Sequence, residues 1–189
     1  MRLYYGSTEV PLTERGKYEL KKLAESGIYP DSPDAEFYTS GMVRTEQTFR
    51  IIFGDRPHKV IDEFRELDFG DFEMHSYEEL RARVEYQAWI SAENMSEAPP
   101  GGESIPDFNR RVQKGFEDMK VRHELLVLKL RNRQKEAKSI CVCHGGVICA
   151  VMNYIWPDET DNFYEWIPDP GHGYVLEMED GAIIGRRKF

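Results

Sequence analysis

The sequence has no apolar run long enough to cross a membrane, and it contains only three cysteines. This small, odd number without a signal-like start fits free thiols in a reducing cytosol, so we expect a cytoplasmic protein. Basic residues are also in the minority, since 25 lysines and arginines stand against 34 acidic residues. The net charge of −9 argues against nucleic acid as the main partner, because nucleic-acid binding needs a basic face. It leaves room for a small anionic ligand held by a few local arginines.

Strand and helix patterns alternate along the 189 residues, which predicts one α/β domain with a mostly parallel sheet. Helices are expected to begin at Thr13, after the cap Ser40 and at Ser104, the last of them running to about residue 133. Further helices are expected over residues 77–92 and 147–156. Strands are expected over residues 35–39, 59–64 and 139–144, with a hairpin at Asp180-Gly181. Ligands of such sheets bind at the carboxyl ends of the strands.

A β-prone stretch ends at His144, two glycines follow, and an apolar helical segment comes next. Glycines allow close approach of the backbone, and the free N–H groups of a helix start attract anions. An imidazole stands beside that position. We therefore expect an anion site at His144 and Gly145, although a buried strand histidine with a satisfied hydrogen bond is the alternative.

Arg44 lies at a second corner between a strand and a helix. A cation is unfavourable at a helix N-terminus unless an anion is shared between the guanidinium and the backbone. The alternative is a surface arginine paired with a carboxylate such as Glu46.

The stretch 64–73 is acidic and aromatic and follows a predicted strand. A carboxyl group against aromatic rings has a raised pKa and can donate a proton. The pattern leaves open which carboxyl this is; the candidates are Glu66, Asp68, Asp71 and Glu73.

Cys141 and Cys143 alternate on one strand face directly before His144, which raises the question of a metal. A tetrahedral site needs a second pair of ligands, and the sequence offers none at suitable spacing. We therefore interpret both thiols as small buried hydrophobes and expect no metal.

Several segments together resemble the histidine phosphatase superfamily, the phosphoglycerate-mutase-like proteins. They are Tyr5-Gly6-Ser7-Thr8-Glu9-Val10-Pro11-Leu12-Thr13-Glu14-Arg15-Gly16, Thr39-Ser40-Gly41-Met42-Val43-Arg44, Arg65-Glu66-Leu67-Asp68-Phe69-Gly70, Pro99-Pro100-Gly101-Gly102-Glu103-Ser104 and Val142-Cys143-His144-Gly145-Gly146. Their order matches the family over nearly the whole chain. The resemblance implies a three-layer α/β/α fold, of which this chain lacks the first strand, with a helix and loop over residues 74–104 that cap the site.

The resemblance also implies roles for single residues. Arg44 and Gly145 would bind the phosphoryl oxygens, Glu66 would protonate the leaving alcohol, and His144 would donate a hydrogen bond to the phosphoryl group. Tyr5, Gly6, Glu103 and Ser104 are candidates for further substrate contacts. These roles suit phosphoryl transfer, in which positioning and charge stabilisation dominate.

One family element is missing from the sequence. The nucleophile of the family is the histidine of an Arg-His-Gly motif at the end of the first strand, and no such motif occurs here. Met1 would then be an internal methionine or a boundary artefact of a longer enzyme, or the chain would be a remnant that binds phosphoesters without turnover. The first explanation is favoured because the other motifs are intact.

The implied function is hydrolysis of a small phosphorylated metabolite through a phosphohistidine, without a cofactor. The chain is short for a cofactor-dependent phosphoglycerate mutase, so it more closely resembles the phosphatase branch of the family, which includes enzymes similar to α-ribazole phosphatase. A phosphate-binding pseudophosphatase and a phosphoglycerate mutase are the alternatives. No membrane partner is expected, and a homodimer is left open.

Overall fold

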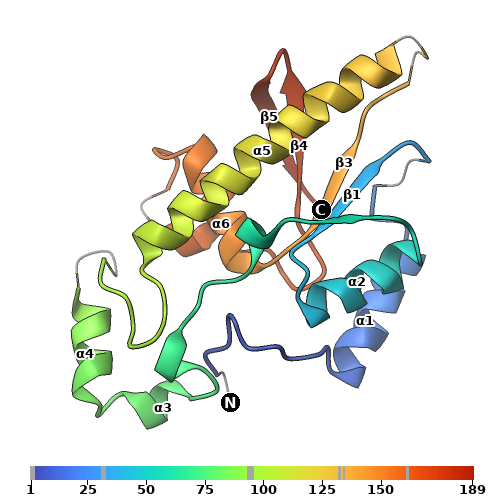
Figure 1. Ribbon diagram of the computed structural model, residues 1–189. Coiled ribbons are helices and arrows are strands. Elements are labelled where there is room, and N and C mark those ends of the chain that lie inside the picture. The colour runs from blue at the N-terminus through green and yellow to red at the C-terminus, as the bar shows by residue number, and fades with distance from the viewer. Residues whose placement is uncertain (1–2, 31–32, 93–95, 132, 134, 161) are drawn as a thin grey trace.

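Three parallel strands form the central sheet of this protein. The computed structural model describes residues 3–30, 33–92, 96–131, 133, 135–160 and 162–189 (Figure 1). The sheet order is β2 (Lys59–Val60), β1 (Glu36–Thr39) and β3 (Ser139–Val142). Thr39 of β1 pairs with Val142 of β3 and with Val60 of β2, so all three strands end at the same edge.

Helices cover both faces of this sheet. On one face, Phe37 of β1 packs against Phe49 of α2 (Val43–Phe53), with ring centroids 5.6 Å apart. On the other face, Tyr38 joins a core with residues of α5 (Ile105–Arg131) and α6 (Gly145–Ile155). Neighbouring residues of a strand point to opposite faces, so β1 is buried on both sides. The predicted three-layer α/β/α arrangement is confirmed.

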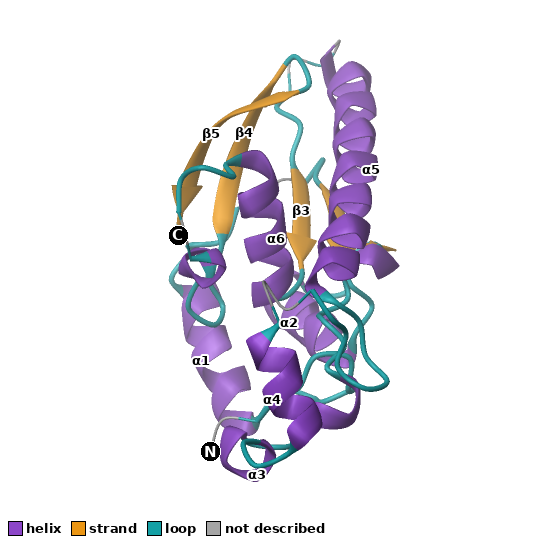
Figure 2. Ribbon diagram, turned by 90° about the vertical axis from the view of Figure 1, so that its left-hand side faces the viewer, coloured by secondary structure: helices purple, strands orange, loops and turns teal. Residues whose placement is uncertain are grey.

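A terminal hairpin of β4 (Tyr174–Glu179) and β5 (Ala182–Lys188) forms a second, antiparallel sheet (Figure 2). Tyr174 and Leu176 of β4 pack against α6 and the short helix η4 (Phe163–Trp166). Helix α1 (Glu14–Glu25) lies along α2. The predicted hairpin at Asp180-Gly181 is confirmed, and so is Thr13 as the cap of α1.

Two sequence predictions are wrong in their extent. Residues 59–64 are not one strand, because β2 ends at Val60 and the 3-10 helix η1 (Asp62–Phe64) follows. Phe64 turns inward there to meet α5 at Gly115, where an added Cβ would lie 3.1 Å from the ring. Residues 77–92 form two short helices, α3 (Tyr77–Leu80) and α4 (Val84–Ser91), because the extended Arg83 interrupts the helix.

Ser40 does not cap α2. The N-cap position is Met42, and the buried Ser40 hydroxyl instead contacts His144 and Thr45. Among the caps predicted from sequence, Ser104 does accept a hydrogen bond, from the backbone N–H of Asp107 at the start of α5.

Helices α3 and α4 stand at one end of the molecule with the 3-10 helix η2 (Gly70–Phe72) (Figure 1). Tyr4 and Phe69 pack there against a buried cluster formed by Phe72, Leu80, Tyr86 and Trp89. None of the described residues of 74–104 lines the cavity described below, so a role for this segment as its cap stays a prediction.

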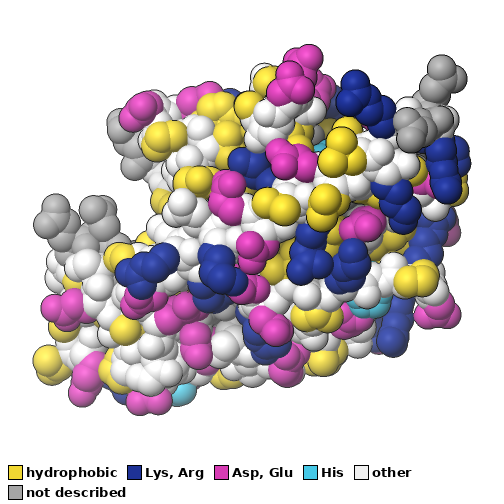
Figure 3. All heavy atoms as spheres, turned by 45° about the horizontal axis from the view of Figure 1, so that its top comes forward, with side chains coloured by type: hydrophobic (Ala, Val, Ile, Leu, Met, Phe, Trp, Pro, Cys, Tyr) yellow, Lys and Arg dark blue, Asp and Glu magenta, His cyan; other side chains and the backbone are white. Residues whose placement is uncertain are grey.

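Charged side chains of both signs are interspersed on the face that carries α5 (Figure 3). Lys114 pairs with Glu63, and Arg110 pairs with Asp107. No helix built from the described residues has the length and apolar character that a membrane crossing demands.

Two neighbouring leucines of α5 test the packing of this helix. Leu126 is 3% exposed, whereas Leu125 is 61% exposed. We expect Leu126→Ala to lower the free energy of unfolding by about 2–5 kcal/mol, because it leaves a cavity. The matched control Leu125→Ala should change it by less than about 0.5 kcal/mol. Urea denaturation measures both, and equal effects would contradict the described orientation of α5.

Candidate active site

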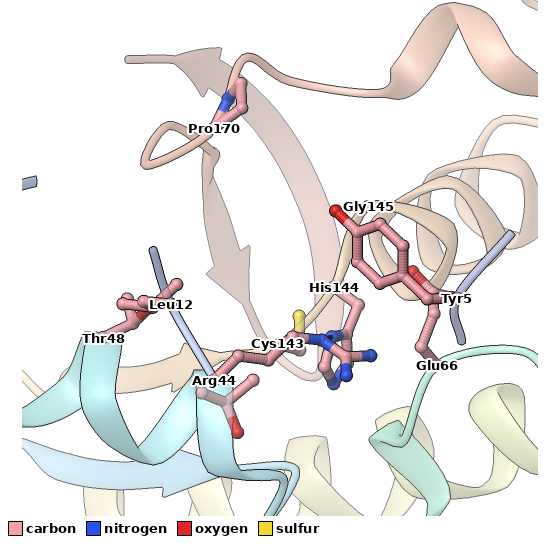
Figure 4. Close-up of a pocket in the computed structure, with 10 residues that line it drawn as sticks. Tyr5, Leu12, Arg44, Thr48, Glu66, Cys143, His144, Gly145 and Pro170 are labelled. Atoms are coloured by element: carbon pink, nitrogen blue, oxygen red, sulfur yellow. Dashed lines mark hydrogen bonds between the residues drawn. The ribbon is translucent and has the colours of Figure 1, made fainter. Parts of the chain in front are cut away.

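A cavity of ≈ 300 Å³ opens at the carboxyl ends of β1 and β3. Figure 4 shows Arg44 and His144 next to each other, with Tyr5 and Glu66 close by. The lining residues are Tyr5, Leu12, Arg44, Thr45, Thr48, Glu66, Cys143, His144, Gly145 and Pro170. The two strand-to-helix corners that the sequence predicted therefore meet in one place.

His144 follows β3 and forms the N-cap of α6. Its side chain is buried, with 7% of its surface exposed. Nδ1 accepts a hydrogen bond from Arg44 Nε at 3.2 Å, and Nε2 lies 2.8 Å from Ser40 Oγ. Both ring nitrogens are thus engaged by residues of the strand-to-helix corner after β1.

The imidazole of His144 is neutral near pH 7. Burial, together with the positive charges of Arg44, Arg65 and Arg111, lowers its pKa to about 3. A charged imidazolium is poorly solvated in such a place and is repelled by the arginines.

Arg44 sits in the first turn of α2 and spans from His144 to the N-terminal segment. Nη1 donates to Thr8 O at 3.0 Å, and Nη2 donates to Gly6 O at 2.6 Å. The two Nη atoms carry four hydrogens, so two of these remain beyond the contacts to Gly6 and Thr8. Tyr5 lies with its ring centroid 6.0 Å from the guanidinium carbon.

Glu66 points at the start of α6. Its Oε2 accepts from Gly146 N at 3.0 Å, and its Oε1 accepts from Leu67 N at 3.0 Å. Gly146 permits this approach, because an added Cβ would lie 2.3 Å from Oε1. Burial raises the pKa of the Glu66 carboxyl. This effect outweighs the two backbone N–H donors and the charges of Arg44 and Arg111, all of which lower the pKa. The group is therefore biased towards the protonated form that a general acid needs.

The loop that carries Glu66 is held by Arg111 of α5. Arg111 Nη1 donates to Glu63 O at 2.8 Å and to Arg65 O at 2.7 Å, and Nη2 donates to Glu66 O at 3.1 Å. The same guanidinium forms a bidentate ion pair with Glu103. All of the N–H groups of a guanidinium find acceptors in this arrangement, which ties the Glu66 backbone to α5.

The N-terminal segment is held by Glu73. Its carboxylate accepts from Ser7 N at 2.6 Å, from Thr8 N at 2.7 Å and from the hydroxyl of Thr8. Burial raises the pKa of Glu73, but the hydrogen bonds from Thr8 and Ser7 lower it more, so the net pKa lies below its usual value. Gly6 is needed in this segment, because an added Cβ would overlap Leu67 O at 1.6 Å.

The structure brings most of the predicted site residues together. Arg44, Glu66, His144, Gly145 and Tyr5 all line the cavity.

Three predicted substrate contacts lie outside it. Gly6 offers its carbonyl to Arg44 and its N–H to Glu73, Glu103 is engaged by Arg111, and Ser104 caps α5. Among the carboxyls left open by the sequence, only Glu66 reaches the cavity, since Asp68 accepts from Ser7 and Glu73 holds the N-terminal segment.

Sequence reasoning missed the parts played by Ser40, Gly146 and Arg111. A serine before a helix has the signature of a cap, and an arginine in the middle of a helix has no distinctive pattern. Gly146 gave the one available signal in the sequence, because a second glycine after His144 indicates that another group approaches the backbone closely there.

The remaining histidines do not line the cavity. His58 contacts Glu46, His123 contacts Ser139, and His75 and His172 contact backbone carbonyls. The described residues also contain no cluster of three or more His, Cys, Asp or Glu side chains able to hold a metal ion.

This is a parallel α/β protein with an arginine, a histidine and helix N–H groups at the strand ends, the kind of site that suits an oxyanion. The family comparison agrees with this class. The model of the histidine phosphatase superfamily (branch 1) matches residues 1–187, and the chain belongs to this superfamily.

Curated relatives include two kinds of enzyme. The adenosylcobalamin/alpha-ribazole phosphatase of Salmonella typhimurium is 30% identical over 116 residues, which cover 59% of this chain and 56% of the relative. The match thus spans little more than half of that relative. The 2,3-bisphosphoglycerate-dependent phosphoglycerate mutase 2 of Gloeobacter violaceus is 28% identical over 170 residues, covering 84% of this chain and 71% of the relative.

Solved structures share the fold. The alpha-ribazole phosphatase from Shigella flexneri superposes with a TM-score of 0.72 at 22% identity, covering 96% of this chain and 85% of that one. The YhfR protein of Bacillus stearothermophilus gives a TM-score of 0.72 at 22% identity, with coverages of 97% and 86%.

Glu73 provides a pH-dependent test of how the N-terminal segment is held. Because the folded-state pKa of Glu73 is lowered, its contribution to stability is present at neutral pH and is lost as the pH falls through that pKa. We expect Glu73→Gln to lower the free energy of unfolding at pH 7 by about 1.5–3 kcal/mol, the value of hydrogen bonds to a charged group.

Between pH 7 and pH 3, the free energy of unfolding measured by denaturation should then depend less on pH for Glu73→Gln than for the wild type. Glu78→Gln, at an exposed carboxyl paired with Arg81, is the matched control. Parallel curves for the wild type and Glu73→Gln would contradict the assigned role.

Proposed function

We propose that the cavity binds the phosphoryl group of a small phosphomonoester and that the enzyme to which this domain belongs is a phosphatase. The observation that carries the proposal is the meeting of Arg44, His144 and Glu66 at one ≈ 300 Å³ cavity. The phosphatase relatives and the superfamily match support it. The substrate class is a small phosphorylated metabolite, and the phosphatase branch is preferred to the mutase branch, whose members are also relatives.

Arg44, Glu66 and the start of α6 each have a role in that reaction. Arg44 holds phosphoryl oxygens with the Nη hydrogens that Gly6 and Thr8 leave over, and the N–H groups at the start of α6 add further positive potential. Glu66, with its raised pKa, gives a proton to the oxygen of the leaving alcohol as the P–O bond breaks. In the superfamily the phosphoryl group passes to a histidine of an Arg-His-Gly motif, which this sequence does not contain.

A second candidate function is phosphate binding without turnover. It is favoured by the state of His144, the one histidine that lines the cavity. Both of its ring nitrogens are hydrogen-bonded, to Arg44 and Ser40, so neither is free to attack phosphorus.

Turnover and binding measured on the full-length protein that carries this sequence separate the two functions. For a phosphatase, we expect hydrolysis of both p-nitrophenyl phosphate and an alkyl phosphate. Glu66→Gln should lower kcat on the alkyl phosphate by about 10²–10⁴, because an alkoxide needs a proton to leave. The loss on p-nitrophenyl phosphate should be smaller, because the phenolate leaves without one.

Glu78→Gln serves as the control. Calorimetric binding of inorganic phosphate without turnover would establish the pseudophosphatase. A protein that neither binds phosphate nor hydrolyses either substrate would overturn the proposed function.

A further inference from the structure

The hydrogen bonds around His144 determine where its proton sits. The Nε–H of Arg44 can only donate, so His144 Nδ1 must accept with its lone pair. A neutral imidazole carries one proton, which therefore lies on Nε2. At 2.8 Å from Ser40 Oγ, that Nε2–H donates to the serine oxygen.

The chain of donors continues in one direction. Thr45 Oγ1 donates to Met42 O at 2.8 Å, and a carbonyl oxygen can only accept. The one hydroxyl hydrogen of Thr45 is thereby used. In the 3.0 Å contact between the two hydroxyls, Ser40 must then be the donor. Ser40 Oγ is left to accept, from His144 Nε2 and, at 3.4 Å, from the N–H of Met42.

This order has a consequence for a bound anion. The ring nitrogen next to Arg44 and the cavity is a bare lone pair, which repels the oxygen of an anion. The superfamily resemblance assigned His144 the role of a donor to the phosphoryl group, yet the neutral ring donates its only N–H to Ser40. If an anion oxygen accepts the Nε–H of Arg44, the lone pair of His144 Nδ1 loses its donor. A proton must then be added between Nδ1 and the anion to replace that hydrogen bond.

We propose that Arg44 at Nδ1 and Ser40 at Nε2 together fix the proton of His144 on Nε2, so that an anion binds between Arg44 and His144 only together with one further proton shared between the anion and Nδ1. This inference rests on the proposed anion site and adds that Ser40 is a positioning residue. A dianion then brings one proton from solvent or from Glu66. A singly protonated phosphate brings its own, on the oxygen that faces Nδ1.

The surroundings of His144 agree with this coupling. In the free protein, burial and three arginines keep the second proton off the ring. A bound dianion cancels that positive charge, so the imidazolium becomes favourable. Groups of every neighbouring element face or influence the ring; they are Tyr5 of the N-terminal segment, Arg44 of α2, Glu66 and Arg65 of the loop after η1, Arg111 of α5 and Cys143 after β3.

The test reads the two ring nitrogens directly, by ¹⁵N NMR of the full chain labelled at histidine. In the free wild type we expect a bare Nδ1 and a protonated Nε2, with His144→Gln identifying the signals. Ser40→Ala should give a mixture of both tautomers. Ser76→Ala, which removes another buried serine hydroxyl, should leave the His144 signals unchanged.

Thr45→Val supplies a second, shape-conserving variant. It removes the acceptor of the Ser40 hydroxyl, which can then donate to Nε2, so the proton should shift towards Nδ1. A protonated Nδ1 in the free wild type, or tautomers indifferent to Ser40 and Thr45, would overturn the assignment to Ser40.

Sulfate is the anion probe, because it takes up no proton near neutral pH. In Glu66→Gln, which removes the internal proton source, saturation with sulfate should protonate both ring nitrogens of His144. Its affinity should fall about tenfold for each pH unit of increase, the linkage expected for one proton. Ser40→Ala in the same background should show a shallower slope.

The outcomes separate the two levels of the proposal. Sulfate binding that leaves His144 with one proton overturns the inference and leaves the anion site standing. Absence of sulfate and phosphate binding overturns the proposed function and the coupling with it.

Discussion

The hydrogen bond from Arg44 Nε to His144 Nδ1 is the contact on which the site depends. It joins the corner after β1 to the corner after β3, 100 residues apart in the chain. The parallel register of the two strands brings their ends level, so the two side chains meet without distortion of either strand. A cation against a neutral imidazole also explains why the ring stays unprotonated, since burial and the guanidinium act in the same direction.

The acid of the site is supported from the opposite side. Glu66 contacts the first turn of α6, while Arg111 fixes the backbone of its loop and is itself fixed by Glu103. The charge at Glu66 is poorly solvated there, and the same position lets its proton reach a ligand in the cavity. The site thus combines a positively charged wall with a carboxyl group of raised pKa, an arrangement suited to a phosphoryl group that leaves an alcohol behind.

The sequence predicted the parts of the site that local patterns encode. Arg44 and His144 each follow a β-prone stretch and open a helix, and parallel strands place such corners at one edge. Glu66 could be separated from its acidic neighbours only through the family resemblance. The three-layer architecture followed from alternating elements, whereas the break between α3 and α4 did not, because residues 81–83 carry neither proline nor glycine.

Tertiary hydrogen bonds account for the rest. Ser40 has the local signature of a cap, but its oxygen is hydrogen-bonded to a ring nitrogen 104 residues away. Glu103 and Ser104 belong to a loop whose composition indicates exposure, yet Arg111 and the start of α5 engage them. No pattern within one segment reports such partners.

The most direct test of the central claim is a crystal structure of the chain with phosphate at saturating concentration. We predict one phosphate in the cavity, with oxygens within hydrogen-bond distance of both the Arg44 guanidinium and His144 Nδ1. A cavity without phosphate, or a phosphate that contacts neither side chain, would contradict the account.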